Sequence, residues 1–228
     1  METATVLRDL RLRLDQTDLA DLPGRLLYSG VGTLKPGPIY LLGWNPGGDP
    51  DVEPDTPAEH LEKLERERVD WNEYLDGYWR PGGRVLGKGQ APMQKRVVHL
   101  LQGIGVEPRT ICASNLIFMR SRGKDGLSQG DNLVRRCWLV HDFLLGIVRP
   151  KIVLSIGGNA VLDALLRKGA ETGGRAAKAS GHADWECQSV RARLGQHQVR
   201  IVSVPHLSRY AIDHHPDVVR WVRDQIAA

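Results

Sequence analysis

Four short apolar runs alternate with amphipathic helical patterns along this chain, and this alternation is the strongest constraint on its fold. The apolar runs cover residues 39–44, 110–118, 151–157 and 198–204. The helical patterns cover residues 4–22, 58–75, 91–102, 132–147, 158–168 and 216–227. Strands that are apolar throughout and separated by helices are typical of a parallel sheet covered on both faces. We therefore predict an α/β fold with four parallel strands.

The segments between these elements carry two further expectations. Residues 170–184 consist largely of Gly and Ala, with Lys, Ser and His among them, which indicates a flexible loop. Residues 187–194 alternate or run apolar, so they are expected to pair with 198–204. Three of the four predicted strands lead into polar or glycine-rich segments. These segments are expected to meet at the carboxyl edge of the sheet, where ligands bind in open α/β folds.

Length and composition favour one domain, residues 1–228, with residues 46–90 as an acidic loop and helix insertion. No apolar run is long enough to span a bilayer, and the first residues lack the pattern of a signal peptide. The three cysteines lack CxxC spacing, which indicates reduced thiols and a cytoplasmic protein. No assembly signature is visible, so a monomer without membrane association is expected.

Charge is divided unevenly along the chain. The net charge is +4, but residues 46–76 hold 11 acidic and three basic side chains. That segment therefore carries −8, and the rest of the chain carries +12. A basic body suits contacts with phosphates, although an ordinary charged surface explains it equally well.

Three polar side chains follow or interrupt the apolar runs. Asn45 lies in a turn in which Pro46 fixes its own φ and two glycines then allow close backbone approach. Asn115 lies inside an apolar run, where its amide needs hydrogen-bonding partners. His206 follows the last run. Each also has an ordinary explanation, as a turn former, a core amide satisfied by the backbone or a polar loop residue.

Taken in order, these segments resemble the uracil-DNA glycosylase superfamily from about residue 25 to the end. Gly43-Trp44-Asn45-Pro46-Gly47 resembles the Gly-x-Asn-Pro-Gly motif of the mismatch-specific and single-strand-selective monofunctional branches. Asn115 resembles the strand asparagine that reads the flipped base. His206-Leu207-Ser208-Arg209-Tyr210 resembles the closing His-Pro-Ser-Pro loop, with Leu207 and Arg209 in place of the prolines.

The resemblance implies a three-layer sandwich, a central four-stranded parallel sheet between helices, with a DNA groove at the carboxyl edge. It implies hydrolysis of the N-glycosidic bond of uracil, or of a related deaminated or damaged base, in DNA. No metal or organic cofactor is implied. Asn115 would recognise the base, with Gly43 and Trp44 beside it. His206 would stabilise the departing base, and Asn45 would position the attacking water.

The resemblance also assigns the closing loop and leaves other positions open. Ser208 and Arg209 would contact DNA, and Tyr210 would be inserted into the vacated base stack or, alternatively, be a half-buried loop aromatic. The aromatic that stacks on the base has no clear match, and the candidates are Trp44, Tyr78, Trp79 and Phe118. Asp49 could assist the water. His206, Asp213, His214 and His215 lack the spacing of zinc motifs.

Two other classes of function stay open from the sequence. One is a catalytically inactive protein on the same fold that binds nucleic acid or another protein, which the acidic segment and the missing prolines favour. The other is a small-molecule enzyme that acts on a nucleoside or nucleotide.

Overall fold

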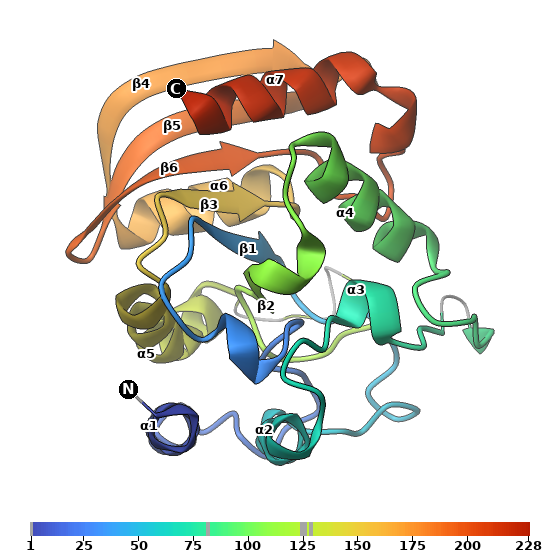
Figure 1. The fold of residues 1–228 in the computed structure, drawn as a ribbon, viewed down its shortest axis with the longest axis vertical. Helices are drawn as coiled ribbons and strands as arrows, with labels where there is room; N and C mark the ends of the chain where they lie inside the picture. Colours follow the sequence, from blue (N-terminus) through green and yellow to red (C-terminus); the bar gives the residue numbers. More distant parts are fainter. Residues whose placement is uncertain (1, 81–82, 124–126, 128–129) are drawn as a thin grey trace.

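A six-stranded mixed sheet forms the centre of the molecule and is covered by helices on both faces (Figure 1). The computed structural model describes residues 2–80, 83–123, 127 and 130–228. The strands, in chain order, are β1 (Ile39–Gly43), β2 (Cys112–Asn115), β3 (Ile152–Ser155), β4 (Ala170–Ala179), β5 (Glu186–Leu194) and β6 (His197–Ser203). Their order across the sheet is β2-β1-β3-β6-β5-β4.

The four strands predicted from the apolar runs are neighbours in this sheet and run parallel to one another. The sheet nevertheless continues beyond them, because β5 pairs antiparallel with β6, and β4 pairs antiparallel with β5. The predicted pairing of 187–194 with 198–204 is therefore confirmed. The prediction of a central four-stranded parallel sheet has to be corrected to a mixed sheet of six strands.

Strand β4 replaces the flexible loop predicted for 170–184. Its ladder to β5 is interrupted by register shifts on either side of Gly173, where Gly173 and Gly174 both have positive φ. Most β4 side chains are exposed or only half-buried, so the strand carries no apolar pattern. Its backbone hydrogen bonds to β5, rather than side-chain burial, define it as a strand.

The helices follow the predicted order with two differences. They are α1 (Thr3–Asp15), α2 (Pro57–Arg66), α3 (Glu73–Asp76), α4 (Pro92–Gly103), α5 (Gly130–Val148), α6 (Asn159–Lys168) and α7 (Pro216–Ala227). Helix α1 ends early because the Thr17 hydroxyl donates to the Leu14 carbonyl and accepts from the Leu19 N–H. The predicted 58–75 helix is split because the carbonyls of Val69 and Trp71 accept hydrogen bonds from residues 30–32.

Side chains on the two faces of the sheet form two separate cores. One face packs against α1, α2, α5 and α6 through alternate residues such as Tyr40 and Leu42. The other face packs against α4 and α7 through Ile39 and Leu41, and it continues into Tyr28 and Tyr74. Among the described residues, no helix is long and apolar enough to cross a membrane.

A buried histidine links the sheet to α5. His141 Nε2 donates to the Leu116 carbonyl at 3.1 Å, and the Tyr40 hydroxyl therefore donates to His141 Nδ1 at 2.8 Å. This arrangement requires the neutral imidazole, and burial lowers the pKa of His141 to about 4.

The free energy of unfolding should therefore fall as the pH drops from about 6.5 to about 4. In that range the unfolded histidine binds a proton that the folded one does not, which costs up to ~1.4 kcal/mol per pH unit for each such group. Buried His60, with its pKa also lowered by burial, adds to the slope. Urea unfolding at several pH values tests this. His141→Gln should be less stable at neutral pH but show a shallower slope, and an unchanged slope would contradict the assignment.

Candidate active site at the carboxyl edge of the sheet

The loops that follow β1, β3 and β6 touch one another at the carboxyl edge of the sheet. A Cβ atom on Gly157, just after β3, would lie 3.0 Å from the Trp44 backbone nitrogen and would collide with Val161. A Cβ on Gly158, whose φ is +69°, would lie 3.6 Å from the His206 nitrogen. Glycines are needed here because strand, helix and neighbouring loops approach so closely. The Gly157-Gly158 turn thus brings the Asn45 and His206 loops to a common edge.

Asn115 lies at the end of β2, directly opposite Gly43 in the parallel register with β1. Its side chain folds over the Gly43 Cα, and a Cβ atom at residue 43 would collide with Asn115 Oδ1. Residues 41, 43, 113 and 115 alternate onto the sheet face that packs against α4, because successive side chains of a strand point to opposite faces. Gly43 is therefore the residue that makes room for the Asn115 amide.

The Asn115 side chain lies beside the Tyr28 hydroxyl. Asn115 is only 4% exposed, and its side chain acts to lower the pKa of Tyr28. Burial outweighs this effect and raises the pKa of Tyr28, so the hydroxyl stays protonated at neutral pH. Tyr28 is itself held in place, because its backbone N–H donates to the Ala113 carbonyl at 2.7 Å. No sequence motif indicates this contact, because Tyr28 lies far from Asn115 along the chain.

Tyr28 belongs to a cluster of aromatic and charged side chains. The Tyr28 ring stacks on Tyr74 at 5.7 Å and meets Trp79 edge-on at 6.3 Å. Trp79 Nε1 donates to Glu73 Oε1 at 2.7 Å, and Glu73 also forms an ion pair with Arg25. These contacts place half-buried Trp79 on the Asn115 side of the sheet. Of the four aromatic candidates for stacking on the base, Trp79 has a ring that contacts Tyr28, which lies beside Asn115.

Trp44 and Phe118 lie elsewhere. The Trp44 ring packs against the core on the α5 face, and its Cζ2 atom lies near Gly130. Phe118 is fully buried with its ring 5.1 Å from that of His141. The ring of Trp44, expected to lie beside Asn115 in base recognition, therefore packs on the sheet face opposite to that of Asn115.

The Asn45 side chain joins the loop after β1 to the loop after β2. Its Nδ2 donates to the carbonyls of Pro46 at 2.8 Å and Met119 at 3.2 Å, and to the Ser121 hydroxyl oxygen at 2.9 Å. Since all these bonds use the amide nitrogen, the orientation of the side chain is fixed. Within the described part of the chain, no donor to Asn45 Oδ1 is found, so this oxygen remains an available acceptor.

Arginines pair with several carboxylates of the acidic segment that follows Asn45. Arg120 pairs with Glu53 at 2.7 Å and donates to the Gly47 carbonyl at 2.6 Å. Arg122 contacts Asp49 at 2.8 Å and Asp51 at 2.6 Å. The hydrogen bond from Arg122 lowers the pKa of Asp49, so this carboxylate is a weak base. The Arg109 guanidinium donates bidentate hydrogen bonds to the Asp76 carboxylate, at 2.6 and 2.9 Å.

The ring of His206 is fixed by the loop that follows it. The Ser208 backbone N–H donates to His206 Nδ1 at 3.2 Å, and the Ser208 hydroxyl lies 2.7 Å from the same atom. A backbone N–H can only donate, so Nδ1 accepts and the proton of the neutral ring sits on Nε2. Burial, reinforced by the nearby Arg209, lowers the pKa of His206. His206 therefore presents Nε2–H as a neutral donor.

The rest of this loop is partly exposed and partly buried. Ser208 and Arg209 are exposed, and Arg96 from α4 donates to the carbonyls of Leu207 at 2.8 Å and Ser208 at 3.1 Å. Tyr210, in contrast, is fully buried. Its hydroxyl donates to the Ser180 carbonyl at 2.6 Å, and its ring stacks on His215 at 4.8 Å.

Tyr210, expected either to be inserted into DNA or to be a half-buried loop aromatic, is thus fully buried in this structure, and its ring and its hydroxyl both make contacts inside the protein.

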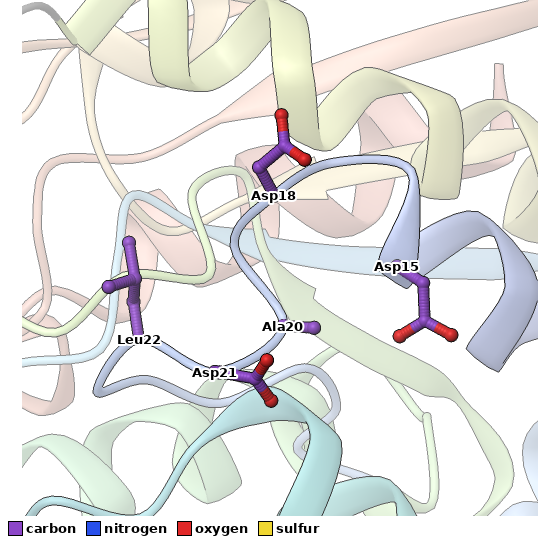
Figure 2. Close-up of a pocket in the computed structure, with 5 residues that line it drawn as sticks. All are labelled: Asp15, Asp18, Ala20, Asp21 and Leu22. Carbon is purple, nitrogen blue, oxygen red and sulfur yellow. The ribbon is translucent and has the colours of Figure 1, made fainter.

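No group of three or more His, Cys, Asp or Glu side chains among the described residues could hold a metal ion. A surface hollow of about 470 Å³ beyond the end of α1 is lined by Asp15, Asp18, Ala20, Asp21 and Leu22 (Figure 2). Its three carboxylates do not converge on one point, since that of Asp18 points away from the other two (Figure 2). Arg11 also holds Asp15 at 2.8 Å. The hollow contains none of the residues described above.

A scan of protein-family models found none that matches this chain, and a search of curated proteins likewise found no match.

NMR of the imidazole nitrogens tests the state of His206. At neutral pH the ring should be neutral with the proton on Nε2, and its pKa should lie below the usual 6.5. Arg209→Ala should raise that pKa because it removes a nearby positive charge. A His206 pKa above 6.5, or a proton on Nδ1 of the neutral ring, would contradict the hydrogen bonding described here.

Proposed function

We propose that this protein is a monofunctional DNA glycosylase that hydrolyses the N-glycosidic bond of uracil or a related deaminated or damaged base. One observation carries the proposal. Three oriented side chains, Asn45, Asn115 and His206, lie at the ends of three parallel strands of one sheet, and each offers a defined hydrogen-bonding atom. The sequence resemblance assigns complementary roles to the same three residues.

Asn115 is suited to recognise the Watson–Crick edge of uracil. An oriented amide offers one donor and one acceptor, which match uracil O4 and N3–H. Cytosine presents the opposite pattern and would leave both groups unpaired, at a cost of a few kcal/mol in a buried site. The contact with Tyr28 and the close fit over Gly43 limit rotation of the amide and so support selectivity.

His206 is suited to stabilise the departing base. As the bond between C1′ and the base nitrogen breaks, its electron pair goes to the base, and negative charge develops on the base oxygens. A fixed Nε2–H donor directed at that charge lowers the barrier without reorganisation. A neutral ring serves this purpose, since its proton is held in place by the Ser208 contacts to Nδ1.

Asn45 is suited to orient the water that completes the reaction. The water oxygen forms the new bond to C1′, and its proton passes to solvent. Asn45 Oδ1 can accept a hydrogen bond from that water while Nδ2 is anchored to the loop after β2. An amide hardly removes a proton, and Asp49 is bound to Arg122, so slow hydrolysis of a sugar with cationic character is expected.

A second candidate is a nucleic-acid-binding protein on the same fold without catalysis. The burial of Asn115 favours it, because a base reaches this amide only if covering side chains move. The burial of Tyr210 favours it as well, since the loop then lacks an inserted aromatic.

Incubation with uracil-containing single- and double-stranded oligonucleotides, followed by alkaline cleavage at abasic sites, separates these candidates. We expect wild type to release uracil, and His206→Ala to lower the rate by about 10²- to 10³-fold, the usual effect of losing one such donor. Asn45→Ala should lower it by about 10²-fold or more. Gln102→Ala, which removes an exposed amide of α4, should leave it unchanged.

The outcomes distinguish the three classes of function. Release that persists when Asn45, Asn115 and His206 are all replaced by alanine would refute the assigned roles. Salt-dependent DNA binding without release would favour the non-catalytic protein. Absence of both would leave a small-molecule substrate or a protein partner.

A pair of glycine variants tests the position of the Asn115 amide. In Gly43→Ala the new methyl group displaces Asn115, so uracil release should fall by about 10²-fold, as is typical of a 1 Å misplacement. Gly47→Ala is the matched control in the same loop, because a Cβ atom there meets nothing within 4 Å. Equal rates for the two variants would show that Asn115 does not bind the base.

A further inference from the structure

Between α3 and α4 the structure describes residues 77–80 and 83–89, and these described residues are called the 77–89 arm below. Its two ends are held together, because the N–H of Gly89 donates to the Gly77 carbonyl at 3.2 Å and that of Leu86 to the Trp79 carbonyl at 3.0 Å. The buried Gln94 amide fastens the base of the arm by donating to the carbonyls of Glu73 at 2.8 Å and Gly77 at 2.9 Å.

The 77–89 arm has a charge opposite to that of the segment before it. The chain from Gly77 to Val106 contains five Lys and Arg and no Asp or Glu. Arg80, Arg84 and Lys88 are exposed, and none of them takes part in an ion pair with the described residues. Arginines at the acidic segment, such as Arg120 and Arg122, are instead paired with carboxylates.

The arm also exposes apolar surface. Tyr78 is 61% exposed and Val85 is 55% exposed. The Lys88 ammonium lies 5.5 Å from the centre of the Tyr78 ring. An exposed aromatic ring among cations without acidic partners matches single-stranded nucleic acid, which offers stacking faces and phosphates together.

Both ends of the arm connect to the proposed active site. At one end Trp79 contacts Tyr28, whose hydroxyl lies beside the Asn115 side chain. At the other end the arm leads into α4, whose Arg96 donates to carbonyls of the His206 loop. The segment between α3 and α4 lies on the side toward which β1, β3 and β6 point (Figure 1).

We propose that the 77–89 arm is the nucleic-acid-engaging element of this protein. Arg80, Arg84 and Lys88 bind the phosphates that flank the target nucleotide. Tyr78 stacks on the base next to it, in place of the buried Tyr210. This inference rests on the proposed function for the identity of the nucleic acid as DNA.

Fluorescence anisotropy with a labelled uracil-containing DNA, single-stranded and duplex, tests the phosphate contacts over a salt series. The triple variant R80A/R84A/K88A should bind more weakly, and the slope of log affinity against log salt should decrease by about two to three. The matched control K35A/K151A/R220A removes the same charge from exposed positions outside the arm. Equal losses in the two triple variants, or no DNA binding by wild type, would overturn the proposal.

The stacking role of Tyr78 has its own readout. With 2-aminopurine beside the uracil, wild type should change the fluorescence of the probe on binding. Tyr78→Ala should lose most of that change, and Tyr78→Trp should retain it. An unchanged signal in Tyr78→Ala would refute the stacking role.

Uracil release by wild type, measured in parallel, separates the two proposals. If wild type releases uracil and R80A/R84A/K88A neither weakens DNA binding nor slows release, the proposed role of the arm is overturned and the proposed glycosylase activity is kept. If DNA binding depends on the arm but no uracil is released, the proposed glycosylase activity is overturned and the role of the arm is kept.

Discussion

The parallel pairing of β1 with β2 is the constraint on which the site depends. It places Gly43 directly opposite Asn115, and the absence of a side chain at Gly43 leaves space for the amide. The pairing also makes both strands end at one edge, so that the next loops run side by side. Asn45 then joins them through Ser121 and Met119. A single register thus fixes the positions of both asparagines.

Charge pairing explains how a basic protein accommodates a strongly acidic insertion beside this edge. The carboxylates of Asp49, Glu53 and Asp76 are held by arginines from later parts of the chain, and Glu73 is paired with Arg25. These four carboxylates are therefore neutralised where the segment folds onto the rest of the protein. Positive charge without acidic partners among the described residues remains on the 77–89 arm. This distribution reduces the electrostatic conflict between a polyanionic ligand and the acidic segment.

Structural features that depend on residues close together in the sequence could be predicted, whereas features that depend on long-range contacts could not. The four parallel strands and their glycine-rich ends could be predicted, because continuous apolar runs and turn residues are local signals. Strand β4 could not, because its side chains are mostly exposed and only backbone pairing with β5 defines it. The contact of Tyr28 with Asn115 and the burial of Tyr210 under Ser180 and His215 arise from long-range packing. The sequence therefore indicated the asparagines and the histidine, but it did not indicate their aromatic surroundings, the sheet face on which Trp44 packs or the burial of Tyr210.

The most direct test of the central claim is an NMR titration with free uracil, which follows the side-chain amides of Asn45 and Asn115 and the ring of His206. If the three residues line one base site, the signals of Asn115 and His206 shift together and saturably with uracil, with a smaller effect at Asn45. Cytosine at the same concentration then leaves them unchanged. Shifts confined to other parts of the molecule, or equal shifts with cytosine, would contradict the account.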